Sequence, residues 1–137
     1  MKLKDKIAIV TGGAMGNGLG IVKIFLKHGA KVSIFDYSEK LQNTVDILKS
    51  EGYDVDGYSV DIRDSGQIKN AIDKIIAKYN KIDILVNNAS IIAGETFLSF
   101  KEYIPLGSKC ISIFNSCFPF RKIILLKELC TVVSCWS

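Results

Sequence analysis

Closely spaced glycines form the most chemically suggestive stretch of this sequence. An apolar run at residues 7–10 leads into Gly12, Gly13, Gly16 and Gly18, after which apolar residues recur at helical spacing. The pattern predicts a buried strand, a glycine-rich turn and a helix. Such a turn points backbone N–H groups past the end of the strand, and the positive end of the helix dipole adds to them. This stretch therefore indicates a site for a phosphate or pyrophosphate.

Two better-known glycine motifs do not fit this stretch. Ile21 stands where Gly-x-Gly-x-x-Gly would require its last glycine, and no Gly-Lys-Ser/Thr sequence follows, so the turn is not a P-loop. A glycine-rich turn with a purely structural role remains open at this point.

Asp36 follows the second expected strand, at residues 31–35. It comes 20 residues after Gly16, the distance at which a dinucleotide fold places an acid on the adenosine ribose. A carboxylate there accepts hydrogen bonds from the ribose hydroxyls and repels a 2′-phosphate, so we expect NAD to be preferred over NADP. The alternative is that Asp36 only caps the next helix, but Ser38 can take that role.

Polar residues also follow the next two expected strands. The strand at 53–60 leads into Asp61 and Ile62, and the strand at 83–86 leads into Asn87 and Asn88. Between the strands, apolar residues repeat at intervals of three and four, which predicts amphipathic helices near residues 19–26, 41–48 and 68–79. Alternating strands and helices give a parallel sheet with helices on both faces. Right-handed crossovers then set the strand order 3-2-1-4, with the ligand above the first strand.

Taken together, these residues resemble the short-chain dehydrogenase/reductase family. The resemblance rests on Thr11-Gly12-x-x-x-Gly16-x-Gly18, on Asp36, on Asp61 with Ile62, and on Asn87-Asn88-Ala89-Ser90, where the family has glycine in place of Ser90. It covers residues 3 to about 100. It implies an α/β fold of the Rossmann type, a doubly wound parallel sheet, and hydride transfer between NAD(H) and a small alcohol or carbonyl.

The resemblance also implies which residues bind the cofactor. Asp61 and Ile62 would bracket the adenine, and Asn87 would approach the nicotinamide ribose. Met15 supports NAD, because family members that use NADP often carry a basic residue within the turn. The full set of implied cofactor-binding residues is Gly12, Met15, Gly16, Asn17, Gly18, Asp36, Asp61, Ile62 and Asn87.

The character of the sequence changes after Phe100. Both prolines, the only tryptophan and all four cysteines lie beyond this point. We therefore divide the chain into a dinucleotide-binding Rossmann half-domain at 1–100, with the sheet truncated, and an irregular, aberrant C-terminal tail at 101–137. One strand-like stretch, residues 131–136, could pair with the fourth strand.

A frameshift or premature stop near residues 101–104 is our hypothesis for the tail, and a partner-binding segment is its rival. The nucleotide sequence past codon 100 tests the first hypothesis: a second reading frame that encodes Tyr-x-x-x-Lys would support it, and the absence of such a frame would count against it.

The proton-transfer residues that the family uses are not found in the sequence. In the family a tyrosine exchanges a proton with the substrate oxygen, assisted by a lysine four residues on. The residues four positions after the five tyrosines are Leu41, Gly57, Ile62, Asp83 and Gly107. No catalytic residue is assigned, and we expect the chain to be inactive alone. A non-catalytic dinucleotide-binding module, or a fragment that associates with an intact relative, is the alternative.

Composition also limits the kinds of partner and the cellular location that we expect for this chain. The net charge of +4 is spread along expected helix faces, so no nucleic-acid surface is expected. No apolar run is long enough for a membrane span or a signal peptide, which favours a cytoplasmic protein. The cysteines form no Cys-x-x-Cys pair and no metal site is expected. The family's usual tetramer is not expected, because its contacts come from helices that do not match here, and a small-molecule substrate is expected only for a completed chain.

Overall fold

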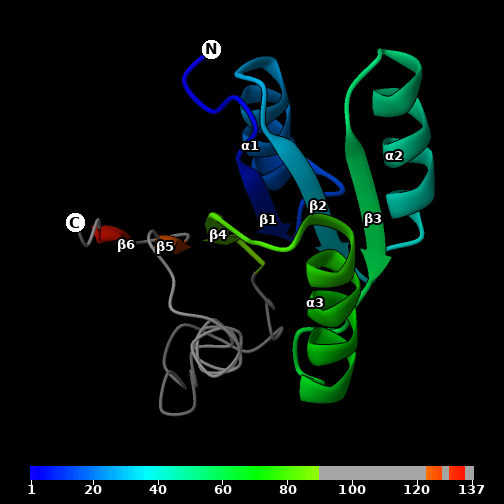
Figure 1. Cartoon of the computed structure of the whole chain (residues 1–137). Coiled ribbons are helices and arrows are strands. Elements are labelled where there is room, and N and C mark those ends of the chain that lie inside the picture. Colours follow the sequence, from blue (N-terminus) through cyan, green and yellow to red (C-terminus); the bar gives the residue numbers. More distant parts are fainter. Residues whose placement is uncertain (90–122, 128–129, 135–137) are drawn as a thin grey trace.

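The computed structural model describes residues 1–89, 123–127 and 130–134, and its centre is a single six-stranded sheet (Figure 1). The strand order is β3-β2-β1-β4-β5-β6. The strands are β1 Ile7–Thr11, β2 Lys31–Asp36, β3 Val55–Ser59, β4 Ile84–Asn87, β5 Ile123–Lys127 and β6 Cys130–Ser134. The helices are α1 Gly16–Lys27, α2 Lys40–Ser50 and α3 Ser65–Tyr79.

The predicted fold of the first part of the chain is confirmed. Strands β3, β2, β1 and β4 lie side by side in that order and are all parallel, as the 3-2-1-4 prediction requires. In register, Thr11 at the end of β1 lies between Phe35 of β2 and Asn87 of β4. The carboxyl ends of these strands therefore meet at one edge of the sheet, where an open α/β sheet places its ligand.

The described part of the expected tail differs from the prediction. Residues 101–137 were expected to be irregular, but β5 pairs parallel with β4, and β6 pairs antiparallel with β5. The strand-like residues 131–134 are in a strand, yet they do not lie beside β4, because residues 123–127 take that place. The run Ile-Ile-Leu-Leu is continuously apolar, as is typical of a parallel strand inside a sheet. The remaining expectations for 101–122, and the Ser90 departure, lie outside the described residues.

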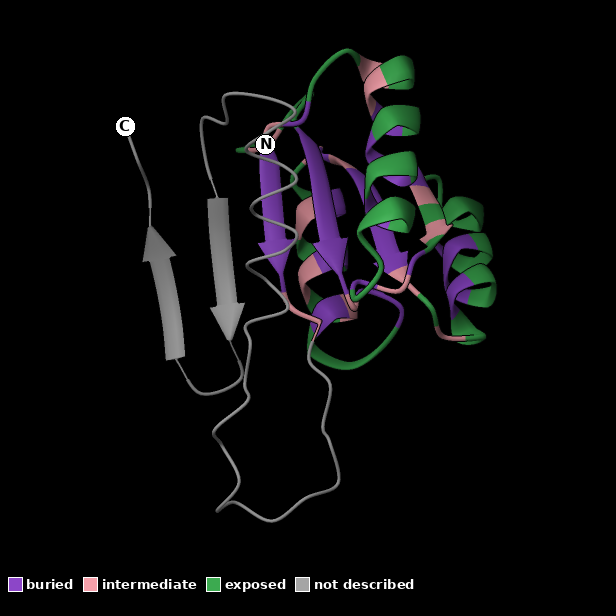
Figure 2. Cartoon of the chain, turned by 90° about the horizontal axis from the view of Figure 1, so that it is seen from below, coloured by how far each residue is buried: buried purple, intermediate pink, exposed green. Residues whose placement is uncertain are grey.

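Two apolar clusters hold the helices against opposite faces of the sheet. Alternate residues of β1 point to opposite faces, so that Ala8 and Val10 pack in the cluster with residues of α1 and α2, and Ile7 and Ile9 pack with α3. Figure 2 shows the central strands buried and the outer faces of the helices exposed. Because β1 is buried on both faces, it serves as the rigid support of the turn that follows it.

The amino ends of β1 and β4 are joined by a charged side chain. The Asp83 Oδ2 atom accepts a hydrogen bond from the Ile7 N–H at 2.9 Å, and the Asp83 N–H donates to the Ile7 carbonyl at 2.8 Å. Lys81 and Lys6 lie 3.1 and 3.8 Å from the carboxylate. Burial alone raises the pKa of Asp83, but the Ile7 N–H and the two ammonium groups outweigh it, so the pKa lies below its ordinary value of 3.8.

Replacing Asp83 by Asn should therefore reduce stability in a pH-dependent way. A lowered folded-state pKa means that the carboxylate contributes stability above pH 3.8, and that this contribution is lost as the pH falls through the folded-state pKa. We expect Asp83→Asn to lower the free energy of unfolding at pH 7 by about 1 kcal/mol. The free energy of unfolding of the Asp83→Asn variant, measured by urea unfolding, should also fall less than that of the wild type between neutral and acid pH.

Asp73→Asn is the matched control, because that carboxylate pairs with Lys69 on the surface of α3. Exposed pairs of this kind contribute little. If the two variants lost stability equally at pH 7, the Asp83 contact would not have the role assigned to it.

Candidate functional site

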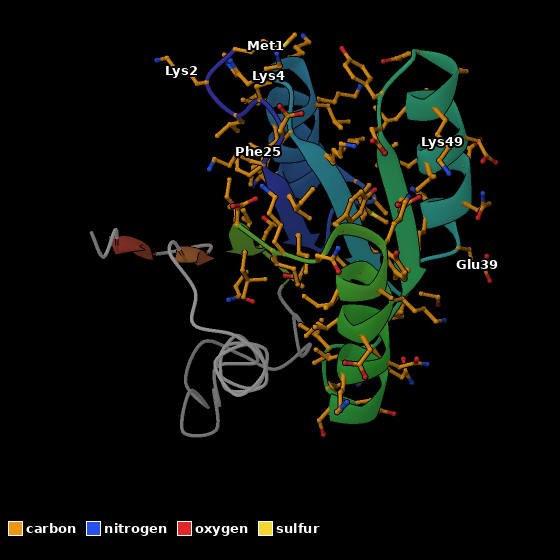
Figure 3. All side chains as sticks on the ribbon, viewed as in Figure 1. Met1, Lys2, Lys4, Phe25, Glu39 and Lys49 are labelled. Atoms are coloured by element: carbon orange, nitrogen blue, oxygen red, sulfur yellow. The ribbon has the colours of Figure 1, made fainter. Side chains whose placement is uncertain are left out.

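A cavity of about 550 Å³ lies at the carboxyl ends of the parallel strands. Its wall is formed by the glycine-rich turn, the first residues of α1, and the segments that follow β2, β3 and β4. Figure 3 shows Glu39, just before α2, at this end of the sheet, and Met1, Lys2 and Lys4 at the opposite end. The lysine-rich start of the chain is therefore remote from the cavity.

Most of the predicted site residues are brought together here. Seven of them line the cavity: Gly12, Met15, Gly16, Asn17, Gly18, Asp36 and Ile62. The two others, Asp61 and Asn87, are not part of its wall. The six other described residues in its wall are Phe35, Tyr37, Ser38, Val60, Asn88 and Ala89. Asn88 and Ala89 belong to the Asn-Asn-Ala-Ser motif quoted above, and Ser38 was named only as a helix cap. Phe35, Tyr37 and Val60 were not predicted, because each is a neighbour of a predicted residue and no property of its own side chain pointed to a site.

Two glycines allow the turn to close against its neighbours. A side chain at Gly18 would place its Cβ atom 2.0 Å from the Gly12 carbonyl oxygen and 2.5 Å from Asn88 Nδ2. Gly12 has φ +66°, and a Cβ atom there would lie 2.9 Å from the Ala89 Cα atom. Neither position has room for a methyl group. The backbone of the turn is thus held directly against the start of α1 and the end of β4, which leaves the cavity open above it.

Hydrogen bonds around Thr11 fasten the turn to the end of β4. The Thr11 hydroxyl is buried, donates to the Val86 carbonyl at 3.3 Å, and accepts from the N–H groups of Asn88 and Ala89 at 3.1 and 3.0 Å. The Asn88 side-chain amide donates in turn to the Thr11 and Gly12 carbonyls, both at 3.2 Å. Asn88 therefore holds the two central strands together.

Asn87 has a different environment from its neighbour. Its side chain is buried, and neither its amide nitrogen nor its amide oxygen has a hydrogen-bond partner in the described part of the chain. Its predicted role at the nicotinamide ribose stays a prediction. A buried amide without partners is costly unless something else satisfies it.

Asp36 stands in the cavity wall with its carboxylate oriented by two backbone donors. Its Oδ2 atom accepts from the Ala14 N–H at 3.0 Å, and Oδ1 accepts from the Ser38 N–H at 2.9 Å. The alternative role as a cap of α2 is not seen, since the Lys40 N–H at the start of α2 donates to the Ser38 hydroxyl at 3.2 Å. Each carboxylate oxygen accepts one of these bonds and has further capacity to accept another.

Asp61 faces Arg63 instead of the cavity. The Arg63 guanidinium binds both carboxylate oxygens, with Nη2 at 2.6 Å from Oδ2, and the Arg63 N–H donates to Oδ1. These hydrogen bonds lower the pKa of Asp61 to about 2. The predicted contact of Asp61 with an adenine stays a prediction, whereas Ile62 supplies an apolar surface to the cavity. Asp64 caps α3, because its side chain accepts hydrogen bonds from the N–H groups of Gly66 and Gln67.

The described wall of the cavity offers groups that could hold the adenosine diphosphate part of a dinucleotide. Among the described residues that line it, Asp36 is the only charged one. A phosphate would therefore be held by backbone N–H groups at the start of α1, whose first-turn donors lack partners within the helix. Among the residues described, no group of three His, Cys, Asp or Glu side chains could hold a metal ion. Over the same part of the chain, no helix is long and apolar enough to span a membrane.

Comparison with known proteins agrees with this geometry. The family model for short chain dehydrogenases matches residues 6–106, which include every cavity-lining residue. The chain belongs to the short-chain dehydrogenase family. It is 43% identical over 101 residues to a 3-oxoacyl-(acyl-carrier-protein) reductase of Chlamydia pneumoniae, a match that covers 73% of this chain and 41% of the reductase. A (+)-borneol dehydrogenase of Salvia officinalis is 37% identical over 99 residues, with 72% of this chain and 37% of that enzyme covered.

Solved structures share the fold. A family member from Burkholderia phymatum in complex with NAD has a TM-score of 0.77 at 21% identity, covering 91% of this chain and 50% of that one. A blue fluorescent protein from a metagenomic library, in complex with NADPH, has a TM-score of 0.76 at 25% identity, covering 94% and 58%. The chain spans about two fifths of the length of the curated relatives it matches.

Gly18 and Gly20, two of the three glycines of α1, give a matched test of the close approach between turn and helix. Gly18→Ala should lower the free energy of unfolding by about 1–3 kcal/mol, because the new methyl group forces the Gly12 backbone to move. Gly20→Ala should raise it by up to about 1 kcal/mol, because Gly20 lies on the same helix with open space around it and alanine favours helix. Thermal unfolding of both variants measures the difference. Equal effects would mean that helix propensity alone decides the stability at both positions.

Proposed function

We propose that this chain binds NAD in the cavity above β1, in preference to NADP. Asp36 supports the proposal most directly, because its carboxylate lines the cavity and is fixed by the N–H groups of Ala14 and Ser38. In this reading the adenosine ribose lies at Asp36, the adenine at Ile62, and the pyrophosphate at the start of α1. Gly12, Met15, Gly16, Asn17 and Gly18 form the pyrophosphate part of the wall.

The preference for NAD follows from charge. A 2′-phosphate would bring a second negative group close to the Asp36 carboxylate, and the described part of the cavity wall carries no cation to offset the repulsion. Met15, in the middle of the turn, is a neutral side chain. Similarity to these proteins does not determine which dinucleotide is bound, since one solved structure of this fold is in complex with NAD and another with NADPH.

Asp36→Asn tests the preference. The amide oxygen of asparagine can still accept one backbone hydrogen bond, but the negative charge is gone. We expect the ratio of NAD affinity to NADP affinity, measured by calorimetric titration, to fall about tenfold, which corresponds to about 1.4 kcal/mol of lost repulsion. Asp46→Asn is the control, because it removes an equal charge from the exposed face of α2. An unchanged ratio in Asp36→Asn, or the same fall in Asp46→Asn, would refute the role given to Asp36.

We further propose that the complete protein is a cytoplasmic oxidoreductase that transfers hydride between NAD(H) and a small alcohol or carbonyl. The nicotinamide supplies or accepts the hydride when NAD is bound. The support is family membership together with a cavity at the carboxyl ends of the strands, whose described wall holds Asp36 and the start of α1. These 137 residues contain no tyrosine followed four positions later by lysine, so we propose that this chain binds the cofactor without catalysing the reaction by itself.

The absence of turnover is directly measurable. The purified 137-residue chain, incubated with NADH and a panel of simple ketones, or with NAD and simple alcohols, should give no change in absorbance at the nicotinamide band above a protein-free control. The reason is that the proton exchanged with the substrate oxygen has no tyrosine–lysine pair to carry it. NAD binding measured on the same sample shows that the chain is folded and loaded. Turnover by that sample would overturn the proposed inactivity.

A further inference from the structure

Thr44 is a polar residue within the apolar stripe of α2. The buried side chains of this helix are Leu41, Thr44, Val45 and Leu48, which lie at successive intervals of three, one and three residues on the face that packs against the sheet. Three of these positions are filled by aliphatic side chains that contribute to the core. A hydroxyl at the fourth needs a hydrogen-bond partner, because a buried polar group without one is costly.

The Thr44 hydroxyl finds its partner in the glycine-rich turn. It donates to the Ala14 carbonyl at 2.9 Å, across a separation of 30 residues in the chain. A threonine inside a helix often bonds instead to the carbonyl four residues earlier, which satisfies the hydroxyl locally. Here the hydroxyl joins α2 to the turn between β1 and α1. The bond is buried, and Ala14 itself is only 2% exposed.

Ala14 is thereby held from two sides. Its N–H donates to Asp36 at the end of β2, and its carbonyl accepts from Thr44 on α2. In a planar trans peptide the carbonyl and the following N–H point in opposite directions. Fixing the Ala14 carbonyl toward α2 therefore directs the Met15 N–H away from α2. Met15 immediately precedes α1 and lines the cavity, so the orientation of this peptide affects the wall that would face a phosphate.

We propose that Thr44 is a positioning residue for dinucleotide binding, acting through the Ala14 peptide. This inference rests on the proposed function and adds to it a residue that does not line the cavity. Thr44 sets the turn from outside, while Asp36 both holds the turn and faces the ligand. Loss of the hydroxyl leaves the Ala14 carbonyl without its buried donor, and the peptide is then free to rotate away from the geometry that binds a phosphate.

The test compares Thr44→Val, which keeps the shape and removes the hydroxyl, with Thr44→Ser, which keeps the hydroxyl. Calorimetric titration of the full 137-residue chain with NAD should show about tenfold weaker binding for Thr44→Val, the factor expected for one buried hydrogen bond. Thr44→Ser should bind NAD as the wild type does. Val45→Ala is the control for stability, because Val45 is buried on the same helix and packs beside Gly57 of β3. It should lower the melting temperature and leave the NAD affinity unchanged.

Wild-type affinity in Thr44→Val, or an equal loss in Val45→Ala, would overturn the proposal. Failure of the wild type to bind NAD would instead refute the proposed function. The effect of the Thr44 hydroxyl on the turn is then tested without ligand. In that case the backbone amide exchange rates of Met15 and Gly16, measured by NMR, should be faster in Thr44→Val than in Thr44→Ser. Equal rates in the two variants would show that the hydroxyl does not hold the turn.

Discussion

The close contact between the glycine-rich turn and the end of β4 is the constraint on which the rest of this site depends. Gly18 and Gly12 bring two backbone segments to a separation that no side chain permits, and Thr11 with Asn88 fastens them by hydrogen bonds. These contacts fix where β1 ends and where α1 begins. The cavity exists because the turn is held down at this point, so that the start of α1 faces the open edge of the sheet.

A second set of contacts connects the turn to β2 and α2. The Ala14 peptide lies between the Asp36 carboxylate and the Thr44 hydroxyl, and both bonds cross from one element to another. Asp36 therefore has two roles that depend on each other: it orients the turn, and the turn orients its carboxylate. A residue that recognises a ribose needs a fixed direction, and two backbone N–H groups provide it without neutralising its charge.

Sequence patterns predicted the parts of this structure that depend on local regularities. The alternation of strands and helices gave the 3-2-1-4 order, and glycine spacing with the 20-residue distance to Asp36 located the cavity wall. Contacts between distant residues could not be predicted in the same way. Nothing in the sequence distinguishes Thr44 from any other threonine in a helix, because its partner lies 30 residues away. Asp61 was placed at a strand end correctly, but its pairing with Arg63 depends on side-chain geometry. Strand β5 was missed because a short apolar run does not show which neighbour it will pair with.

Strands β1 and β4 are held together by a charged group at their amino ends and by neutral groups at their carboxyl ends, beside the cavity. At the amino ends the join is the Asp83 carboxylate with two lysines, whose contribution depends on pH. At the carboxyl ends it is the neutral hydroxyl of Thr11 and the neutral amide of Asn88. An acidic residue in place of Thr11 would set a negative charge beneath a site whose described wall offers a phosphate backbone dipoles and no cationic side chain. With neutral groups beneath the cavity, Asp36 is the only charged residue in the described part of its wall. In the proposed function, the electrostatic choice between a ribose hydroxyl and a ribose phosphate therefore depends on that residue.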